Sequence, residues 1–131
     1  MRVAAFAGES GSGKTTAIVE LVRHFVARGE RVAAIKHTHH EIHDLHRGDT
    51  QRFRDAGASP VILARDTAAF IISNGSVISV TYSEPRELIA YCGDVDLVLV
   101  EGFKRYNAWP RLDPKLALAD HLAILDRIGG P

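Results

Sequence analysis

The segment from Gly8 to Thr15 constrains the fold of this chain more than any other part of the sequence. It reads Gly-Glu-Ser-Gly-Ser-Gly-Lys-Thr and satisfies the pattern G-x-x-x-x-G-K-[ST]. The glycines let successive backbone N–H groups turn inward, and the following helix adds the positive end of its dipole, so such a loop wraps phosphate oxygens. In this pattern the lysine reaches the β- and γ-phosphates of a nucleotide, and the next hydroxyl ligates Mg²⁺. The predicted nucleotide-contacting residues of this segment are Gly8, Glu9, Ser10, Gly11, Ser12, Gly13, Lys14, Thr15 and Thr16.

The segments on either side of the loop supply the structural context that the motif requires. Val3–Ala7 is a short apolar run that is typical of a buried strand. Thr15–Arg28 carries apolar residues at helical spacing and is followed by Gly29, where a helix ends readily. Arg31–Ile35 is a second apolar run. Strand, helix and strand in this order predict a βαβ unit with parallel strands.

The rest of the chain continues this alternation of strands and helices. Asn74-Gly75 separates two β-like runs and is a strong hairpin signal. Ser83 is expected to cap a helix that has Pro85 in its first turn. We therefore expect one α/β domain over residues 1–131, with a three-layer P-loop NTPase fold, a mainly parallel sheet and a local β-hairpin. The remaining expected elements are helices Asp49–Ala56, Glu84–Tyr91 and Asp120–Ile128, and strands Pro60–Ala64, Ala68–Ser73, Ser76–Tyr82, Val95–Val100 and Leu116–Ala119.

A metal-bound nucleotide also needs an acid at the end of a neighbouring strand. Glu101 follows the most apolar run of the chain, so its carboxylate is expected at the carboxyl edge of the sheet, where ligands bind. We therefore assign Glu101 as the metal-linked acid and, together with Lys14, as catalytic. Asp49 is a second candidate near this edge, so the predicted metal ligands are Thr15, Asp49 and Glu101. A solvated strand-end carboxylate is the alternative interpretation of Glu101.

Histidines are concentrated after the second strand, where five of the seven lie between His37 and His46. Three interpretations remain open, namely a transition-metal site, an anion-binding patch and a solvated polar loop. Dense histidine by itself is only a compositional signal, and no cysteine supports a metal site in this segment. We favour anion binding because Lys36 adjoins the segment at the ligand-binding edge of the sheet. Lys36 and His37 are therefore assigned to the nucleotide site.

Composition limits the partners of the chain. Sixteen Lys and Arg residues balance sixteen Asp and Glu residues, and a net charge of zero argues against a broad nucleic-acid surface. No run approaches the roughly 18 apolar residues of a membrane helix, and the N-terminus lacks a signal-peptide pattern. The single cysteine, Cys92, excludes an intramolecular disulfide framework. These features predict a cytoplasmic protein that binds neither nucleic acid nor membrane.

Four segments together resemble the MobB family, the small P-loop GTP-binding adapter proteins of molybdopterin-guanine dinucleotide biosynthesis. They are GESGSGKTT, IKHTHHEIHD, GDTQRFRDAGA and DLVLVEGFK, in the expected order within positions 3–104. Many P-loop proteins share the first segment, whereas the other three together are far more specific. The resemblance implies a homodimer that binds GTP and Mg²⁺ and hydrolyses GTP slowly at most. The implied partners are molybdopterin and the molybdenum cofactor guanylyltransferase that attaches GMP to it.

The functional residues of the family carry over to matching positions of this chain. The resemblance implies that Lys14 and Thr15 hold phosphate and Mg²⁺ and that Glu101 takes the acid position of the EGFK segment. Asp49 matches the acid that precedes the RFRDAGA helix. The histidine run of the family matches His37, His39 and His40.

The chain departs from the family pattern after Lys104, where the usual stretch is compressed. Leu116–Asp120 resembles the last strand of the family followed by an acid, which implies that Asp120 accepts hydrogen bonds from guanine N1 and N2. The sequence contains no Asn-Lys-x-Asp motif, the usual guanine signature of GTPases. The preference for guanine therefore rests on the resemblance.

Two other functions are compatible with the same scaffold. A small-molecule kinase needs an arginine-rich lid over the phosphates, for which Arg47, Arg52 and Arg54 are candidates. A metal-trafficking protein would use the His37–His46 loop and take nucleotide as its switch. Phosphate transfer to a metabolite would indicate the kinase, and stoichiometric metal uptake would indicate the trafficking protein.

Overall fold

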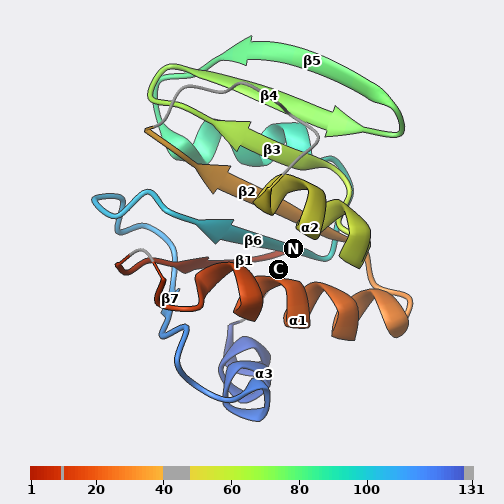
Figure 1. Cartoon of the computed structure of the whole chain (residues 1–131), viewed down its shortest axis with the longest axis vertical. Helices are drawn as coiled ribbons and strands as arrows, with labels where there is room; N and C mark the ends of the chain where they lie inside the picture. The colour runs from red at the N-terminus through yellow and green to blue at the C-terminus, as the bar shows by residue number, and fades with distance from the viewer. Residues whose placement is uncertain (10, 40–47, 129–131) are drawn as a thin grey trace.

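The computed structural model describes residues 1–9, 11–39 and 48–128. These residues form a seven-stranded sheet in the order β5-β4-β3-β2-β6-β1-β7 (Figure 1). The strands are β1 (Arg2–Phe6), β2 (Val32–His37), β3 (Val61–Ala64), β4 (Ala68–Ser73), β5 (Ser76–Thr81), β6 (Leu97–Glu101) and β7 (Arg111–Leu112). The helices are α1 (Lys14–Ala27), α2 (Asp49–Ala56), the 3₁₀ helix η1 (Pro85–Cys92) and α3 (Leu118–Arg127).

The sheet is parallel except for the hairpin of β4 and β5, as the sequence predicts. β6 lies between β1 and β2, so the two strands joined by α1 are parallel but not adjacent. In register, Phe6 of β1 and Lys36 of β2 both pair with Glu101 of β6. Because the strands run in the same direction, their carboxyl ends meet at one edge of the sheet. The segments that follow β1, β2, β3 and β6 therefore gather at that edge.

Helix α1 forms where the sequence predicts it and buries the predicted apolar face. It begins after Gly13, whose backbone is left-handed with φ 92°, a conformation that glycine adopts without steric cost. Its apolar residues recur every three or four positions, and this is the face that it buries against the sheet. The buried residues of α1 are Ala17, Ile18, Val19, Leu21, Val22 and Phe25.

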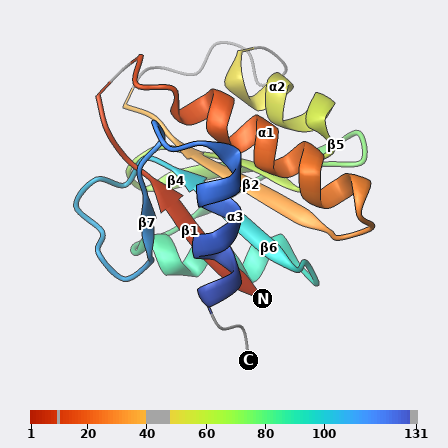
Figure 2. The same cartoon turned by 90° about the horizontal axis from the view of Figure 1, so that it is seen from below.

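The two faces of the sheet carry different layers. Helices α1, α2 and α3 cover one face, where Ile18, Phe53 and Leu125 pack against alternate strand residues (Figures 1 and 2). The other face is covered by η1, through Leu88 and Cys92, and by aromatic side chains of the loops. The three-layer architecture is confirmed, with a thinner layer on the η1 side. None of the described helices is both long and apolar enough to cross a membrane.

Helix α3 is attached to the sheet by a buried histidine. His121 is almost completely buried, and its Nε2 lies 2.7 Å from the carbonyl oxygen of Asp113. Its ring meets the ring of Phe6 edge to face, with the centroids 5.2 Å apart. A buried imidazole that has both a polar and an aromatic partner is a packing residue.

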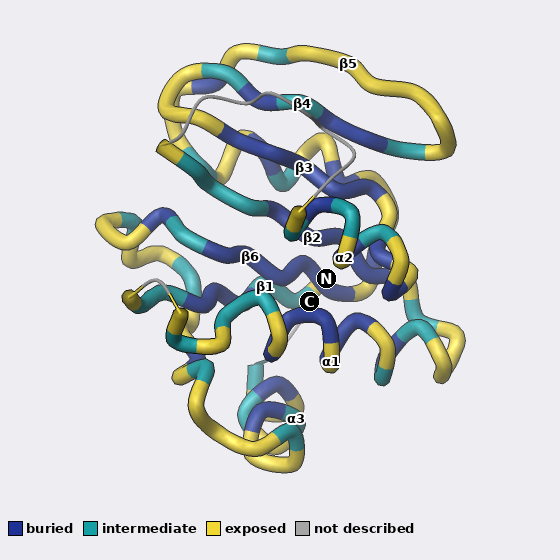
Figure 3. The backbone as a smooth tube through the Cα atoms, viewed as in Figure 1, coloured by how far each residue is buried: buried dark blue, intermediate teal, exposed yellow. Residues whose placement is uncertain are grey.

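The hairpin signal is also confirmed, and it leaves an open edge. Asn74 and Gly75 adopt positive φ angles of 48° and 79°, as a tight turn between strands requires. β4 pairs with β3 on one side and β5 on the other, whereas the outer side of β5 has no strand in the described part of the chain. β5 is consequently exposed along most of its length, including Val77 and Ile78 (Figure 3).

The expected strand at Leu116–Ala119 is wrong. The strand of this region is β7, which pairs with β1 through Ala5 and Phe6, and α3 begins at Leu118. Leu116 is exposed and Ala117 is the extended N-cap of the helix. Leucine and alanine are good helix formers, and a short apolar run does not distinguish a strand from a helix start.

The expected cap of the helix after the hairpin is also wrong. Glu84, not Ser83, is the N-cap, and Glu84 and Glu87 form a reciprocal capping box. Glu87 accepts hydrogen bonds from the backbone N–H groups of both Ser83 and Glu84. The helix is a 3₁₀ helix over Pro85–Cys92 in place of the expected Glu84–Tyr91. A glutamate three residues after the cap is the sequence signature of a capping box, and Glu87 stands in that position after Glu84.

The packing of the η1 layer makes Cys92 chemically inert. Its thiol is buried, and burial raises its pKa to about 12. Because the thiolate is the nucleophile, about one molecule in 10⁴ is reactive at pH 8. We expect an aromatic disulfide reagent to label the folded protein negligibly and to label one thiol per chain in denaturant. Rapid labelling of the folded protein at pH 8 would contradict this packing.

Candidate functional site

The carboxyl edge of the sheet holds a cavity of about 490 Å³ directly over the phosphate loop. The loop follows β1, Lys36 and His37 end β2, and Glu101 ends β6. Helix α2 closes one side of the cavity with Asp49 and Arg52. The lining residues are Gly11, Gly13, Lys14, Thr15, Thr16, Lys36, His37, Thr38, His39, Asp49, Arg52 and Glu101.

Four side chains from four different elements form one polar network in this cavity. The Thr15 hydroxyl donates to Glu101 Oε1 at 2.6 Å, and Lys36 Nζ donates to Glu101 Oε2 at 2.7 Å. Lys36 also forms an ion pair with Asp49. The Glu101 side chain is 6% exposed, so it is not a solvated strand-end carboxylate. The predicted metal residues Thr15, Asp49 and Glu101 are therefore brought together.

Lys36 and Asp49 each stabilise the charged form of the other. Burial lowers the pKa of Lys36, but hydrogen bonds to Asp49 and Glu101 and the charges of these carboxylates more than offset it, and the pKa lies above its usual value. Burial raises the pKa of Asp49, but the hydrogen bond and charge of Lys36, with smaller contributions from Thr15 and Arg52, bring it below its usual value. Lys36 and Asp49 are therefore both charged at neutral pH.

The donor set of the network fits Mg²⁺. Mg²⁺ prefers oxygen ligands and is usually held by one or two carboxylates, together with water and substrate phosphates. Thr15 and Glu101 supply a hydroxyl and a carboxylate in contact, and Asp49 adds a second carboxylate. Two carboxylates facing one ammonium leave one negative charge, which favours a divalent cation.

The phosphate loop has the expected shape around Lys14. Its ammonium donates to the Gly8 carbonyl oxygen at 2.8 Å, so the side chain folds back along the inside of the loop. The Ser12 hydroxyl is buried within the loop and has no hydrogen-bond partner among the described residues. A Cβ at Gly8 would lie 3.1 Å from that hydroxyl, so a side chain at this position would require the Ser12 side chain to shift. The loop, the lysine and the helix start fit a nucleotide phosphate.

Not all of the predicted residues reach the cavity. Gly8, Glu9 and Ser12 belong to the loop but do not line the cavity described above. Asp120 lies exposed in the first turn of α3 and does not line it either. Ser10, His40 and Arg47 lie outside the described residues, as does most of the segment from His37 to His46.

His37 is held at the edge of the cavity by the turn that follows β6. Gly102 has φ 104°, and a Cβ there would lie 2.9 Å from the Cβ of His37, so only glycine allows this approach. Phe103 follows with φ 54°, and its ring stacks on the His37 ring at a centroid distance of 4.2 Å. Burial lowers the pKa of His37 below its usual value, despite a hydrogen bond to Asp66 that raises it. His37 is therefore neutral at neutral pH and does not act as a cationic anion-binding group.

A second cavity of about 730 Å³ adjoins the first. The two cavities share Lys14, His37, His39 and Glu101. The loop after β6 forms a wall of the second cavity. The Arg111 guanidinium fixes this loop by donating hydrogen bonds to the carbonyl oxygens of residues 103, 104 and 106. The other lining residues are Asp66, Pro85, Gly102, Phe103, Lys104, Arg105 and Tyr106.

The sequence interpretation missed several lining residues of these cavities as site residues, among them Thr38, Asp66 and Phe103. Asp66 had no local signal, because its place beside His37 depends on the pairing of β3 with β2. Phe103 had none, since its position depends on the backbone of the preceding turn. Arg52 lines the first cavity from α2, as the kinase alternative requires, and its guanidinium lies 3.5 Å from the Thr16 hydroxyl.

Sequence comparison decides the family. The sequence profile of MobB, described as molybdopterin guanine dinucleotide synthesis protein B, matches residues 3–113. The chain belongs to the MobB family. The match confirms the resemblance that was based on the phosphate loop, the histidine run and the EGFK segment.

The relatives and the solved structures agree with this assignment. The chain is 42% identical over 103 residues to the molybdopterin-guanine dinucleotide biosynthesis adapter protein of Haemophilus influenzae, covering 75% of this chain and 54% of that protein. It is 36% identical over 107 residues to the Escherichia coli protein of the same name, covering 76% and 58%. The crystal structure of Bacillus subtilis MobB has the same fold, with a TM-score of 0.51 at 21% identity over 95% of this chain and 74% of that one. The chain thus spans about half the length of the curated MobB relatives it matches.

The Lys36 network predicts a pH-dependent loss of stability. In Lys36→Met the stem of the side chain remains, but Asp49 and Glu101 face each other without their counter-charge. We expect the free energy of unfolding to fall by about 1–3 kcal/mol at pH 7, less than for a fully buried pair because Asp49 is partly exposed. Because the pKa of Asp49 is depressed below 3.8, its share of this stabilisation is present above that pH and is lost as the pH falls through the depressed pKa.

Urea unfolding of both proteins between pH 3 and pH 7.5 measures the effect, without nucleotide or metal. The exposed Lys115 lines neither cavity, so Lys115→Met is the matched control and should remain as stable as the wild type. An equal loss at every pH, or no loss at pH 7, would show that the network does not stabilise the fold in this way.

Proposed function

We propose that this chain binds Mg²⁺ and GTP at the phosphate loop and acts as an adapter in the formation of molybdopterin guanine dinucleotide. The observation that carries the proposal is the convergence of Thr15, Glu101, Lys36 and Asp49 at the mouth of the loop in a member of the MobB family. The names of the curated relatives support the pathway. Nucleotide binding is the principal activity in this proposal, with slow hydrolysis at most.

Each residue of the network has a distinct role in the proposed complex. Lys14 would move from the Gly8 carbonyl to the β- and γ-phosphate oxygens, where its charge is matched. Thr15, Glu101 and Asp49 would hold Mg²⁺ directly or through water, and the ion would neutralise charge between the phosphates. Lys36 would keep the two carboxylates in place. Glu101 and Lys14 are thus the proposed catalytic residues if hydrolysis occurs.

Recognition of guanine is assigned in this proposal to the segment before α3. The carbonyl oxygen of Pro114 lies 4.0 Å from the position that a Cβ of Gly13 would take, so this segment runs beside the phosphate loop. Asp120 lies in the first turn of the helix that follows. A carboxylate accepts from guanine N1 and N2 but repels the acceptor N1 of adenine, and this chemistry supports Asp120 as the discriminating residue.

The proposed partners are a second copy of the chain, molybdopterin and the molybdenum cofactor guanylyltransferase. The open edge of β5 supports strand pairing with a second copy, because unpaired backbone groups and exposed Val77 and Ile78 lie there. The larger cavity next to the nucleotide site supports the approach of a second ligand. The adapter role named for the relatives supports a contact with the guanylyltransferase.

Calorimetry with GTP, GDP and ATP tests the proposal. We expect GTP and GDP to bind one per chain, GTP more tightly with Mg²⁺ than without it, and ATP to bind much more weakly. Asp120→Asn should reduce the preference for GTP over ATP by about 10-fold or more, because one charged hydrogen-bond acceptor is lost. Tight binding of ATP without binding of GTP would refute the guanine assignment.

Two substitutions test the roles of the loop lysine and the acid. Lys14→Ala should weaken GTP binding by about 30-fold or more, because an unpaired phosphate charge remains, and the circular dichroism spectrum should be unchanged. Glu101→Gln should lower affinity about 10- to 100-fold in the presence of Mg²⁺ and much less in its absence. Asp94→Asn is the matched control, since Asp94 is exposed and pairs only with Arg31 at the opposite edge of the sheet. Undiminished GTP binding by Lys14→Ala would refute the phosphate-loop assignment.

A further inference from the structure

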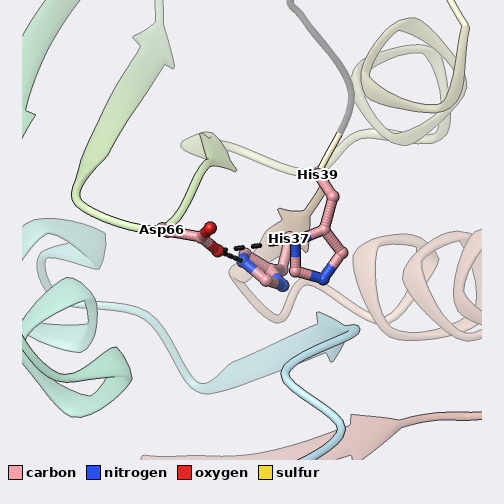
Figure 4. Close-up of side chains that lie close together, drawn as sticks. All are labelled: His37, His39 and Asp66. Atoms are coloured by element: carbon pink, nitrogen blue, oxygen red, sulfur yellow. Dashed lines mark hydrogen bonds and ion pairs between the residues drawn. The ribbon is translucent and has the colours of Figure 1, made fainter.

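A second group of potential ligands lies beside the nucleotide cavity and is not used by the proposed function. It consists of His37, His39 and Asp66, whose side chains converge in Figure 4. Strand register explains the convergence, because His37 of β2 pairs with Ala64 of parallel β3. His39 and Asp66 each lie two residues beyond this pair, and the backbone N–H of Thr38 donates to the Ala64 carbonyl and keeps the two chains together. His39 and Asp66 thus lie in the bends that directly follow β2 and β3.

The distances between these side chains are close to those of a metal site. His37 Nε2 lies 3.0 Å and His39 Nδ1 lies 3.5 Å from Asp66 Oδ1, and all three ligand atoms lie within 4.8 Å of one another. Ligand atoms placed 2.0–2.2 Å from a tetrahedral metal ion are about 3.3–3.6 Å apart. Small side-chain rotations are therefore sufficient to close the set around one ion.

One ligand of the set is rigid and the other two are accessible. The His37 side chain is 11% exposed and is fixed by the stack on Phe103 and the close approach of Gly102. The side chains of His39 and Asp66 are 76% and 72% exposed. The rings of His37 and His39 meet edge to face, with centroids 4.6 Å apart. A fixed imidazole with two exposed ligands at the surface gives an ion a direct path of entry.

The residue types decide which ion is favoured. Two imidazole nitrogens and one carboxylate oxygen suit Zn²⁺, Co²⁺ and related first-row ions, whereas Mg²⁺ and Ca²⁺ prefer an all-oxygen set. Three protein ligands leave at least one coordination position for water or another molecule. His37 and His39 line both cavities, so such a position adjoins the space next to the phosphate loop.

We propose that His37, His39 and Asp66 form a binding site for a divalent transition-metal ion of the Zn²⁺ type, separate from the Mg²⁺ site of the nucleotide. The carboxylate shared by two imidazoles is the decisive observation, because a single hydrogen bond would engage only one of the rings. Without an ion the same three groups form a hydrogen-bonded cluster, and this is the alternative that the experiment must exclude.

The experiment is a titration of the untagged 131-residue chain after chelator treatment, with no nucleotide present. Zn²⁺ binding is followed by calorimetry, and Co²⁺ binding by the visible absorption that reports coordination number and nitrogen ligands. We expect one ion per chain. His39→Ala and Asp66→Asn should each lower the affinity by about 100-fold or more. Even residues that only hydrogen-bond to a metal ligand contribute about 10- to 100-fold to affinity, and a direct ligand contributes more.

The matched control is the triple variant His40→Ala, His43→Ala and His46→Ala, which removes the other three histidines of the same segment. It should bind Zn²⁺ with unchanged affinity and stoichiometry. The proposal is overturned if the wild-type chain binds no ion, if His39→Ala and Asp66→Asn bind as tightly as the wild type, or if the triple variant loses affinity. Thermal unfolding of each variant without metal checks its folding. Because nucleotide is absent, failure of GTP binding would leave this result unaffected.

Discussion

The pairing of Lys36 with two carboxylates is the interaction on which the site depends. It joins the end of β2 to the end of β6 through Glu101 and to the start of α2 through Asp49, while Thr15 ties the first turn of α1 to the same glutamate. Glu101 is nearly buried, and a buried carboxylate needs a compensating charge or several hydrogen bonds. The register of the parallel strands supplies that charge, because Lys36 lies opposite Glu101 on the neighbouring strand.

Much of this arrangement is encoded locally and was therefore predictable. The phosphate loop, the amphipathic α1, the Asn74-Gly75 turn and the apolar run before Glu101 each carry their signal within a few residues. The carboxyl-edge rule then places Lys36 and Glu101 at the same edge of the sheet, and their contact follows from the pairing of β6 with β2. The errors have local causes as well. A short apolar run at Leu116–Ala119 is ambiguous between strand and helix, and Glu84, next to the expected cap Ser83, forms the capping box of η1.

The features that the sequence did not predict depend on contacts between distant segments. Asp66 lies near His37 because β3 pairs with β2, and the order of the strands is not written in either segment. Phe103 reaches the His37 ring only because Gly102 and Phe103 both take positive φ angles. The lowered pKa of His37 likewise results from burial under that ring. The histidine run suggested an anion-binding patch in which the imidazoles could be neutral or charged, and in the folded chain its first member is neutral.

The two ends of the sheet differ in a way that limits how copies of the chain can associate. At one end β5 presents six residues with their outer backbone groups turned to water, and at the other end β7 is two residues long. The sheet therefore has one long edge strand that can pair with another strand and one edge strand that is too short to do so. If two copies join along β5, each has used its long border, and the described part of the chain offers no comparable border to a third. Such pairing would be self-limiting, so it favours closed pairs over open-ended fibres.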